Sequence, residues 1–129
     1  MRAEELKGHL DALLLAALED GPRHGYAVIE SLRQNTGGRL DLPTGTIYPA
    51  LRRLEQAGLI AGTWSVVGGR RRREYQLTPA GIRALSGRRA AWRDFSATVT
   101  AALESATRVN TALENAALED TACPSPNPA

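Results

Sequence analysis

Two groups of residues in the middle of the chain could do chemistry, and both suit the binding of an anion. One is the run of four arginines at 70–73, which directly follows Gly68 and Gly69. The other lies on the preceding segment and consists of Thr44, Thr46, Tyr48, Arg52 and Arg53. Guanidinium groups form charge-assisted hydrogen bonds to phosphate oxygens, and hydroxyl groups donate to the same oxygens. These residue types predict contacts with a phosphate backbone.

No competing catalytic constellation is apparent in the sequence. His9 and His24 have no Cys or Ser partner at a spacing that suits nucleophilic catalysis. The stretch GGRRRR lacks the G-K-[ST] ending of a phosphate-binding P-loop, and the chain has no cluster of residues with metal-ligand spacing. We therefore expect no enzyme activity, no metal and no cofactor.

Apolar residues between positions 43 and 57 recur at the spacing of a helix. The core-facing stripe consists of Ile47, Ala50, Leu51, Leu54 and Ala57. It leaves the polar residues of the second group outward. Pro49 allows two starts: Thr46 as N-cap with Pro49 in the first turn, or a start near Pro43 with an irregularity at Pro49. We favour the second, because Leu-Pro before Thr makes a good helix start. Gly58 suits the position after the helix.

Residues 60–67 and 70–77 predict a β-hairpin, because β-branched and aromatic residues alternate in them and Gly68-Gly69 suits a tight turn. Thr78 and Pro79 then suit the N-cap and first residue of a new helix. Taken alone, the four arginines are as consistent with a solvated charge cluster as with a binding site. Their position at the tip of a hairpin, directly after the Thr/Tyr/Arg-faced helix, favours DNA contacts. Arg73 has two further options, which are pairing with Glu74 or packing on Tyr75.

A helix followed by a basic hairpin is what a winged helix-turn-helix needs to grip DNA. The segments HGYAVIESL, GTIYPALRRLEQAGLI and GGRRRREYQLTPAG resemble the PadR family of bacterial transcriptional regulators, over roughly residues 10–98. The resemblance implies a winged helix-turn-helix domain with one C-terminal dimerisation helix, usually acting as a repressor. It also implies a DNA contact for Tyr48, which lies within a TxYPxL pattern.

The fold class expected is mainly α with a small β-hairpin. A first helix over 4–19 should bury Leu6, Leu10, Leu13, Leu14, Ala17 and Leu18. A second over 25–35, begun by His24, should bury a stripe of Tyr26, Ile29 and Leu32. For Tyr26 we favour a part-buried position over the alternative of a DNA contact. A long helix should follow, broken or kinked near Gly87. The expected domains are 1–77 for DNA binding, 78–119 for dimerisation, and 120–129 as a disordered, proline-rich tail.

The long helix carries an apolar seam that one small domain cannot cover. Its members are Leu85, Trp92, Val99, Leu103, Ala106, Leu113 and Ala117. At 1.5 Å per residue, some 30 residues extend about 45 Å. We therefore expect a homodimer, with the N-terminal helix available to pack alongside. Two-fold symmetry would direct two recognition helices toward a pseudo-palindromic site.

Trp92 and Phe95 are candidates for an effector site on that seam. A pair of Trp92 rings meeting across a two-fold axis would form a flat slot for a planar aromatic compound. The family resemblance is consistent with this, since the family includes regulators that respond to phenolic acids or flat cationic drugs. The alternative is that both rings are simply core.

Charge is uneven along the 129 residues. The chain has a net charge of only +2, but residues 52–93 contain ten arginines against two glutamates. This asymmetry favours an anionic partner at one face. The single cysteine, Cys123, excludes an internal disulfide and suits a reducing bacterial cytoplasm, and no apolar run is long enough for a membrane span.

The sequence therefore predicts a nucleoid-associated regulator that binds double-stranded DNA as a homodimer. We expect it to repress transcription from a pseudo-palindromic operator and to be released by a small aromatic effector. One alternative is a winged-helix adaptor that binds proteins and no DNA. A single-strand or RNA binder is less favoured, because only Trp64 and Tyr75 offer aromatic rings on the hairpin.

Overall fold

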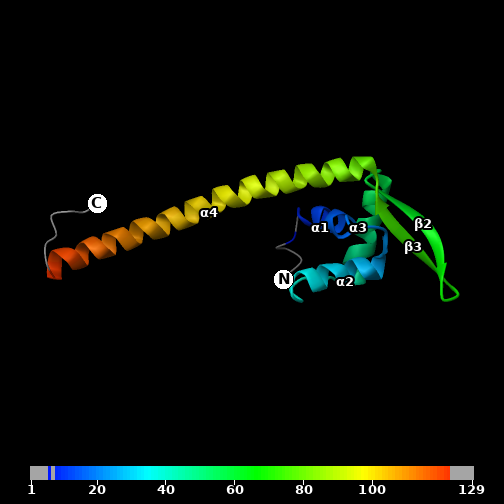
Figure 1. Cartoon of the computed structure of the whole chain (residues 1–129), viewed down its shortest axis with the longest axis horizontal. Helices are drawn as coiled ribbons and strands as arrows, with labels where there is room; N and C mark the ends of the chain where they lie inside the picture. Colours follow the sequence, from blue (N-terminus) through cyan, green and yellow to red (C-terminus); the bar gives the residue numbers. More distant parts are fainter. Residues whose placement is uncertain (1–5, 7, 123–129) are drawn as a thin grey trace. The chain divides into compact units, whose positions relative to one another are not determined.

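The computed structural model describes residues 6 and 8–122, with side chains up to residue 105. The elements are, in order, α1 (Leu10–Ala17), β1 (Arg23–His24), α2 (Gly25–Asn35), α3 (Thr44–Gln56), β2 (Ile60–Val67), β3 (Arg70–Leu77) and α4 (Pro79–Ala122) (Figure 1). Two compact units are distinguished, Met1–Arg89 and Ala90–Ala129, and α4 contributes to both. The first unit contains α1, α2, α3, the start of α4 and a small sheet, in agreement with the predicted fold class.

The first helix is shorter than predicted. Gly8 has a φ of +87°, which no residue inside a right-handed helix adopts, and α1 begins only at Leu10. Leu6 is nevertheless buried in the core, as predicted. Leu15 was not on the predicted stripe, yet it is fully buried. The prediction of one helix over 4–19 is therefore wrong at both ends, since α1 ends at Ala17.

The second helix has the predicted bounds, and His24 is its N-cap. The prediction that Tyr26 is buried is wrong, because its side chain is 58% exposed. The buried residues are Gly25, Val28, Ile29, Ser31 and Leu32. They include the i, i+3, i+4, i+7 spacing of a helical stripe, which passes beside Tyr26.

In α3 the favoured reading of the start is confirmed. Pro43 is the N-cap, its carbonyl oxygen accepts from the N–H groups of Thr46 and Ile47 at 3.0 and 3.1 Å, and Pro49 lies inside the helix. Four of the five predicted stripe residues are buried, but Ala57 is exposed at the C-cap. Gly58 follows with a φ of +76°, so the helix ends where the sequence predicts.

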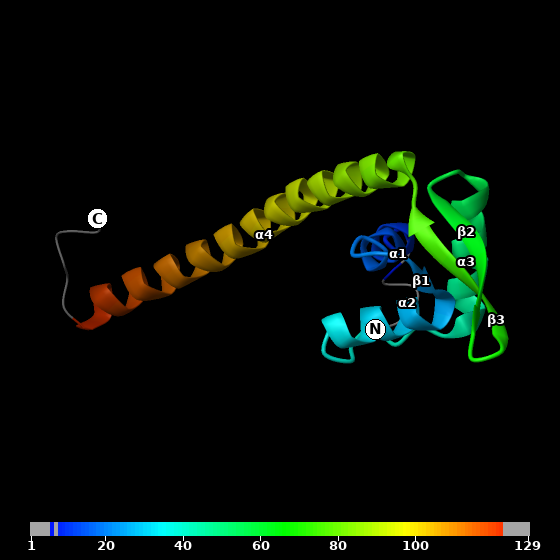
Figure 2. The same cartoon turned by 45° about the vertical axis from the view of Figure 1, so that its right-hand side comes forward.

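The sheet has three antiparallel strands in the order β1-β3-β2 (Figure 2). The hairpin of β2 and β3 is as predicted, and Gly68 and Gly69 make its turn with φ values of +59° and +76°. The third strand, β1, was not predicted. Its two residues extend the sheet by pairing Arg23 with Tyr75 and His24 with Glu74.

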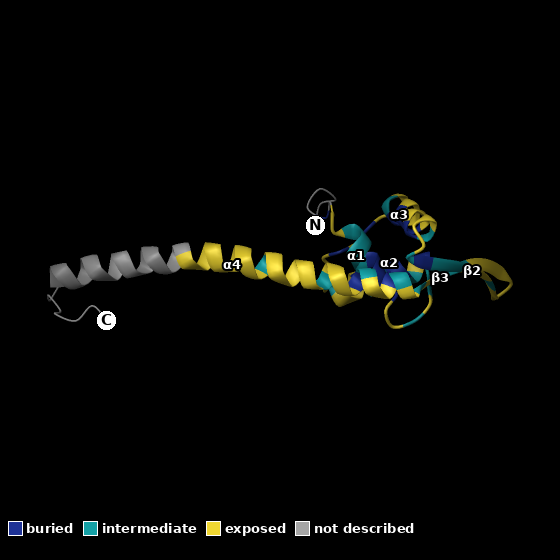
Figure 3. Cartoon of the chain, turned by 90° about the horizontal axis from the view of Figure 1, so that it is seen from above, coloured by how far each residue is buried: buried dark blue, intermediate teal, exposed yellow. Residues whose placement is uncertain are grey.

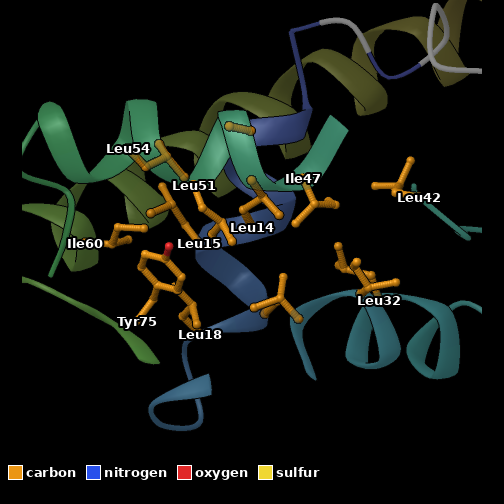
Figure 4. Packing of buried hydrophobic residues seen from close by; sticks show 14 of the residues in the cluster. Leu14, Leu15, Leu18, Leu32, Leu42, Ile47, Leu51, Leu54, Ile60 and Tyr75 are labelled. Carbon is orange, nitrogen blue, oxygen red and sulfur yellow. The ribbon is translucent and has the colours of Figure 1, made fainter. Parts of the chain in front are cut away.

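The core of the first unit lies between the helices and the base of the hairpin. Leu14, Leu15, Ile47, Leu51 and Ile60 are among its most deeply buried large residues (Figure 4). They come from α1, α3 and β2, so burial of one apolar cluster fixes the hairpin against α3.

The last helix begins at a side-chain cap. The Thr78 hydroxyl accepts from the Gly81 N–H at 3.1 Å and donates to the Gly58 carbonyl at 2.6 Å, which confirms Thr78 as N-cap. No break occurs at Gly87, because α4 continues through it to Ala122. The helix therefore includes the first three residues of the predicted tail, and residues 123–129, with Cys123, lie outside the described part. Among the described helices, none has an apolar stretch long enough to span a bilayer.

Candidate nucleic-acid interface

The predicted polar group lies on the outward face of α3. Burial of Ile47, Leu51 and Leu54 on the other face directs this one to solvent. Thr44, at the first position of the helix, is exposed and Thr46 is half-buried. Tyr48, Arg52 and Arg53 are exposed one and two turns further on. Thr44, Tyr48 and Arg52 follow one another at four-residue spacing along one side of this outward surface, and Thr46 and Arg53 lie along its other side. We call the five residues together the α3 face.

The Tyr48 ring packs directly against a glycine of α2. A Cβ atom added to Gly25 would lie 2.3 Å from Cε1 and 3.0 Å from the hydroxyl oxygen of Tyr48. The phenol ring therefore rests on the first residue of α2, where only a glycine leaves room for it. The ring is 40% exposed, so it combines a fixed position with contact to solvent. This places the Tyr48 hydroxyl beside the N-terminus of α2, which favours anions.

The two arginines of α3 have different surroundings. Arg53 forms an ion pair of 3.5 Å with Asp11 of α1, and its side chain stays 60% exposed. Such an exposed pair is worth little and is easily exchanged for a phosphate. Arg52 is exposed one residue earlier on the α3 face. Both arginines are accessible to a ligand.

The hairpin divides its four arginines between two faces. Side chains alternate along a strand, so Arg70 and Arg72 lie on one face and Arg71 and Arg73 on the other. The first three are exposed, and the end of the hairpin is exposed throughout (Figure 3). The guanidinium carbons of Arg71 and Arg73 lie 4.6 and 5.4 Å from the ring centroid of Trp64. Trp64 is thus the aromatic residue that both arginines approach.

Arg73 differs from its neighbours because its guanidinium already has a carboxylate partner. Its Nη2 donates to Oε2 of Glu55, in the last turn of α3. This hydrogen bond raises the pKa of Arg73, while burial raises the pKa of the nearby Tyr75. Glu74, the acid considered from the sequence, instead accepts a hydrogen bond of 3.1 Å from Ser65. The ion pair therefore joins α3 to the wing.

The candidate effector residues belong to the second unit. Trp92 and Phe95 have ring centroids 6.1 Å apart at an interplanar angle of 41°, and their side chains are 51% and 59% exposed. Val99 and Leu103 follow on the same helix and are also exposed. The rest of the predicted seam, Ala106, Leu113 and Ala117, lies beyond the described side chains.

Three residues of this region were not singled out from the sequence: Gly25, Glu55 and Gly62. Trp64 was noted as an aromatic ring on the hairpin, but its contacts with Arg71 and Arg73 were not predicted. The role of Gly25 could have been suspected, because it lies on the helical stripe that Val28, Ile29 and Leu32 continue. Glu55 gave no signal, since its partner is 18 residues away along the chain. Gly62 gave no signal beyond its place in a predicted strand, because a local pattern does not show which side chains lie over that strand.

Three helices with an exposed third helix beside a basic hairpin define the winged helix-turn-helix class, an architecture of DNA-binding regulators. The family model "Transcriptional regulator PadR-like family" matches residues 14–87. The chain belongs to this family of transcriptional regulators.

Individual relatives agree with this assignment. The Transcriptional regulator Rv3488 of Mycobacterium tuberculosis is 40% identical over 74 residues, which is 57% of this chain and 56% of that protein. A PadR family transcriptional regulator of Eggerthella lenta is similar in structure, with a TM-score of 0.69, 35% identity, and coverage of 78% of this chain and 87% of that one. A transcriptional regulator of Clostridium thermocellum has a TM-score of 0.70 at 26% identity, with 76% and 96% covered.

Proposed function

We propose that this PadR-family regulator acts in the bacterial cytoplasm, on the nucleoid, as a homodimeric repressor that binds a pseudo-palindromic operator. The observation that carries the proposal is the exposed α3 face, with Tyr48 and Arg52, in the same compact unit as an arginine-bearing wing. Both elements expose donors suited to phosphates and base edges.

In this proposal α3 enters the major groove. Tyr48 donates its hydroxyl to a phosphate, near the N-terminus of α2, where backbone dipoles favour the same anion. Thr44 and Thr46 contact phosphates or a thymine methyl group, and Arg52 and Arg53 contact phosphates, with base reading by Arg52. The ion pair of Arg53 with Asp11 opens to allow this.

The wing contacts the backbone or the minor groove beside α3. Arg70, Arg71 and Arg72 are exposed and supply the positive charge. Arg73 is the weakest candidate for a DNA contact among the four, because Glu55 already meets its charge.

The proposed dimer is based on the apolar side chains that α4 exposes to solvent. Trp92, Phe95, Val99 and Leu103 are exposed apolar side chains on one helix of 44 residues. Their burial against the same helix of a second copy would remove this surface from water. Two copies then present two α3 faces to one duplex, which suits an operator with two half-sites.

The decisive experiment is a mobility-shift titration on the DNA that flanks the protein's own gene, repeated over a range of salt concentrations. A regulator that neutralises several phosphates per subunit gives a steep fall of affinity with salt, with a slope of about 0.9 per phosphate. A winged-helix adaptor gives no salt-dependent binding to duplex DNA. Absence of such binding removes the proposed function in favour of that alternative.

A planar aromatic effector is the second part of the proposal, and it rests on the tilted Trp92 and Phe95 rings. Quenching of Trp92 fluorescence by a panel of planar aromatic compounds tests it, in a chain whose other tryptophan is replaced by Trp64→Phe. Quenching accompanied by a rise in melting temperature supports a slot. If no compound changes either signal, the two rings serve the helix interface alone.

A further inference from the structure

The least exposed arginine among the ion pairs of the described residues is the one that ties α3 to the wing. In the pair of Glu55 and Arg73, the side chains are 28% and 31% exposed. The arginine side chains of the other three pairs, Arg33, Arg53 and Arg89, are 42–60% exposed. A partly buried, hydrogen-bonded pair is screened less by solvent and holds its geometry better than an exposed one.

The pair occupies a space that a glycine leaves open. A Cβ atom on Gly62 of β2 would lie 2.7 Å from Nε of Arg73 and 2.8 Å from Oε2 of Glu55. The backbone of Gly62 does not have a positive φ, so this glycine is not required by the strand conformation. Its effect is to let the carboxylate and the guanidinium meet directly over β2.

The wing tryptophan extends this contact toward the tip. Gly62 and Trp64 share a strand face with Arg71 and Arg73, because side chains two residues apart point the same way. The guanidinium carbon of Arg73 lies 5.4 Å from the Trp64 ring centroid, and that of Arg71 lies 4.6 Å from it. Contacts therefore run without interruption from Glu55 of α3 through Arg73 and Trp64 to the exposed Arg71.

We propose that Glu55, Arg73 and Gly62 form a clasp that fixes the direction of the wing relative to α3. The Trp64 ring contacts both arginines and extends this fixed geometry from Arg73 to Arg71. This inference rests on the proposed DNA binding. It makes Arg73 and Glu55 positioning residues, and leaves Arg70, Arg71 and Arg72 to meet the phosphates. The ordered wing then presents these arginines in one geometry, so less entropy is lost on binding.

The direction in which DNA affinity changes when Glu55 is replaced separates this clasp from a purely electrostatic effect of net charge. Glu55 is a negative charge beside a surface that binds a polyanion, so its removal alone should tighten DNA binding. If Glu55 positions the wing, its removal weakens binding instead. Glu74 supplies a matched control, because it is also a glutamate of the wing and accepts a hydrogen bond from the neutral Ser65 hydroxyl.

The test uses the full chain and a random-sequence duplex of about three helical turns, titrated at several salt concentrations. Glu55→Gln leaves only a neutral acceptor for Arg73, and Gly62→Ala displaces the pair without changing any charge. We expect each to lower affinity about tenfold and to reduce the salt slope by about one unit, as wing arginines lose phosphates. Glu74→Gln should bind as tightly as the wild type or more tightly.

The slope of Gly62→Ala distinguishes positioning from loss of folded protein. A variant that is merely less stable has fewer active molecules but an unchanged number of phosphate contacts, whereas a displaced wing gives a smaller slope with every arginine present. Should Gly62→Ala fail to fold, the exchanged pair Glu55→Arg with Arg73→Glu takes its place. It should bind more tightly than Glu55→Arg alone, although that single variant carries two more positive charges, because the exchange restores the clasp.

The failures of the two proposals are distinguishable. If the wild type binds this duplex steeply with salt while Glu55→Gln and Gly62→Ala bind at least as well with the wild-type slope, the clasp is overturned and the DNA-binding function stands. A wild type without salt-dependent binding overturns both.

Discussion

At the scale of single residues, Tyr48 has the most constrained position on the α3 face. Its ring occupies the space that a side chain at position 25 would fill, and its hydroxyl lies near the start of α2. A phenol held in this way loses little conformational entropy when it meets a phosphate. The sequence suggested the phosphate contact, but the support from Gly25 appears only in three dimensions.

Tyr48→Phe should lower the affinity for operator DNA by about 1–3 kcal/mol, the range of a hydrogen bond to a charged group. The melting temperature should change little, because the ring that rests on Gly25 remains. Binding titrations measure the first quantity and thermal unfolding the second. Tyr26→Phe is the matched control, since the Tyr26 hydroxyl interacts with Glu30 of its own helix. Equal affinity of Tyr48→Phe and the wild type would rule out the phosphate contact.

At the scale of elements, the wing is a hairpin whose alternation separates neighbouring arginines. Arg70 and Arg71 lie on opposite faces of the strand, although they adjoin in the sequence. A phosphate backbone passing the tip can still meet both, because both are exposed at the end of the hairpin. Base-specific contacts are not expected of such residues, whose charge acts on any duplex.

The double variant Arg70→Ala with Arg71→Ala should therefore weaken binding to operator and unrelated duplexes about equally. The salt slope should fall by roughly one to two units per subunit, since each lost phosphate contact removes about 0.9. Fluorescence anisotropy at several salt concentrations measures both. A wild-type slope in this variant would exclude the wing from the interface.

A second element-scale contact joins the turn after α1 to α4 within the first unit. Arg89 donates to both carboxylate oxygens of Glu19 at 2.6 and 2.7 Å, and these hydrogen bonds lower the pKa of Glu19. A lowered pKa in the folded state means that the pair stabilises the fold above the ordinary pKa of 4.5 and that this contribution is lost as the pH falls through the lowered value.

Glu19→Gln should consequently lower the melting temperature slightly at neutral pH and not at all in strong acid, where the wild-type carboxyl is protonated too. The effect is small because both side chains are exposed. Thermal unfolding of the two proteins across the acid range measures the difference. A difference that persists below the pKa of Glu19 would assign the effect to something other than its charge.

At the scale of the whole molecule, the proposed dimer depends on the exposed apolar side chains of α4. Val99 lies among them, and Ala97 lies nearly on the opposite side of the same helix. The two positions therefore allow the same charge to be placed inside or outside the proposed interface.

Val99→Asp should shift the protein from dimer to monomer in sedimentation velocity, because two carboxylates would be buried against apolar side chains. Its operator affinity should fall while weak half-site binding remains. Ala97→Asp should stay dimeric and bind normally. A wild-type protein that sediments as a stable single copy would contradict the dimer.

The sequence by itself determined the helix and strand types, the tight glycine turn and the α3 face. These follow from local periodicity and turn chemistry, which act over a few residues. The sequence did not show that the Tyr26 side chain is exposed, because the apolar spacing within α2 does not tell whether Gly25 or Tyr26 lies toward the core. It missed β1 as well, since two residues acquire strand pairing only when β3 lies beside them.

Only the tertiary structure decided which charges are available. Four consecutive arginines look equivalent in the sequence, yet the strand turns alternate ones to opposite faces and one of them meets Glu55 of α3. The physical reason is that an ion pair or a ring contact depends on separation in space and not on separation along the chain. Glu55 and Arg73 are 18 positions apart, and they meet only because burial of the common core docks the hairpin against the helix.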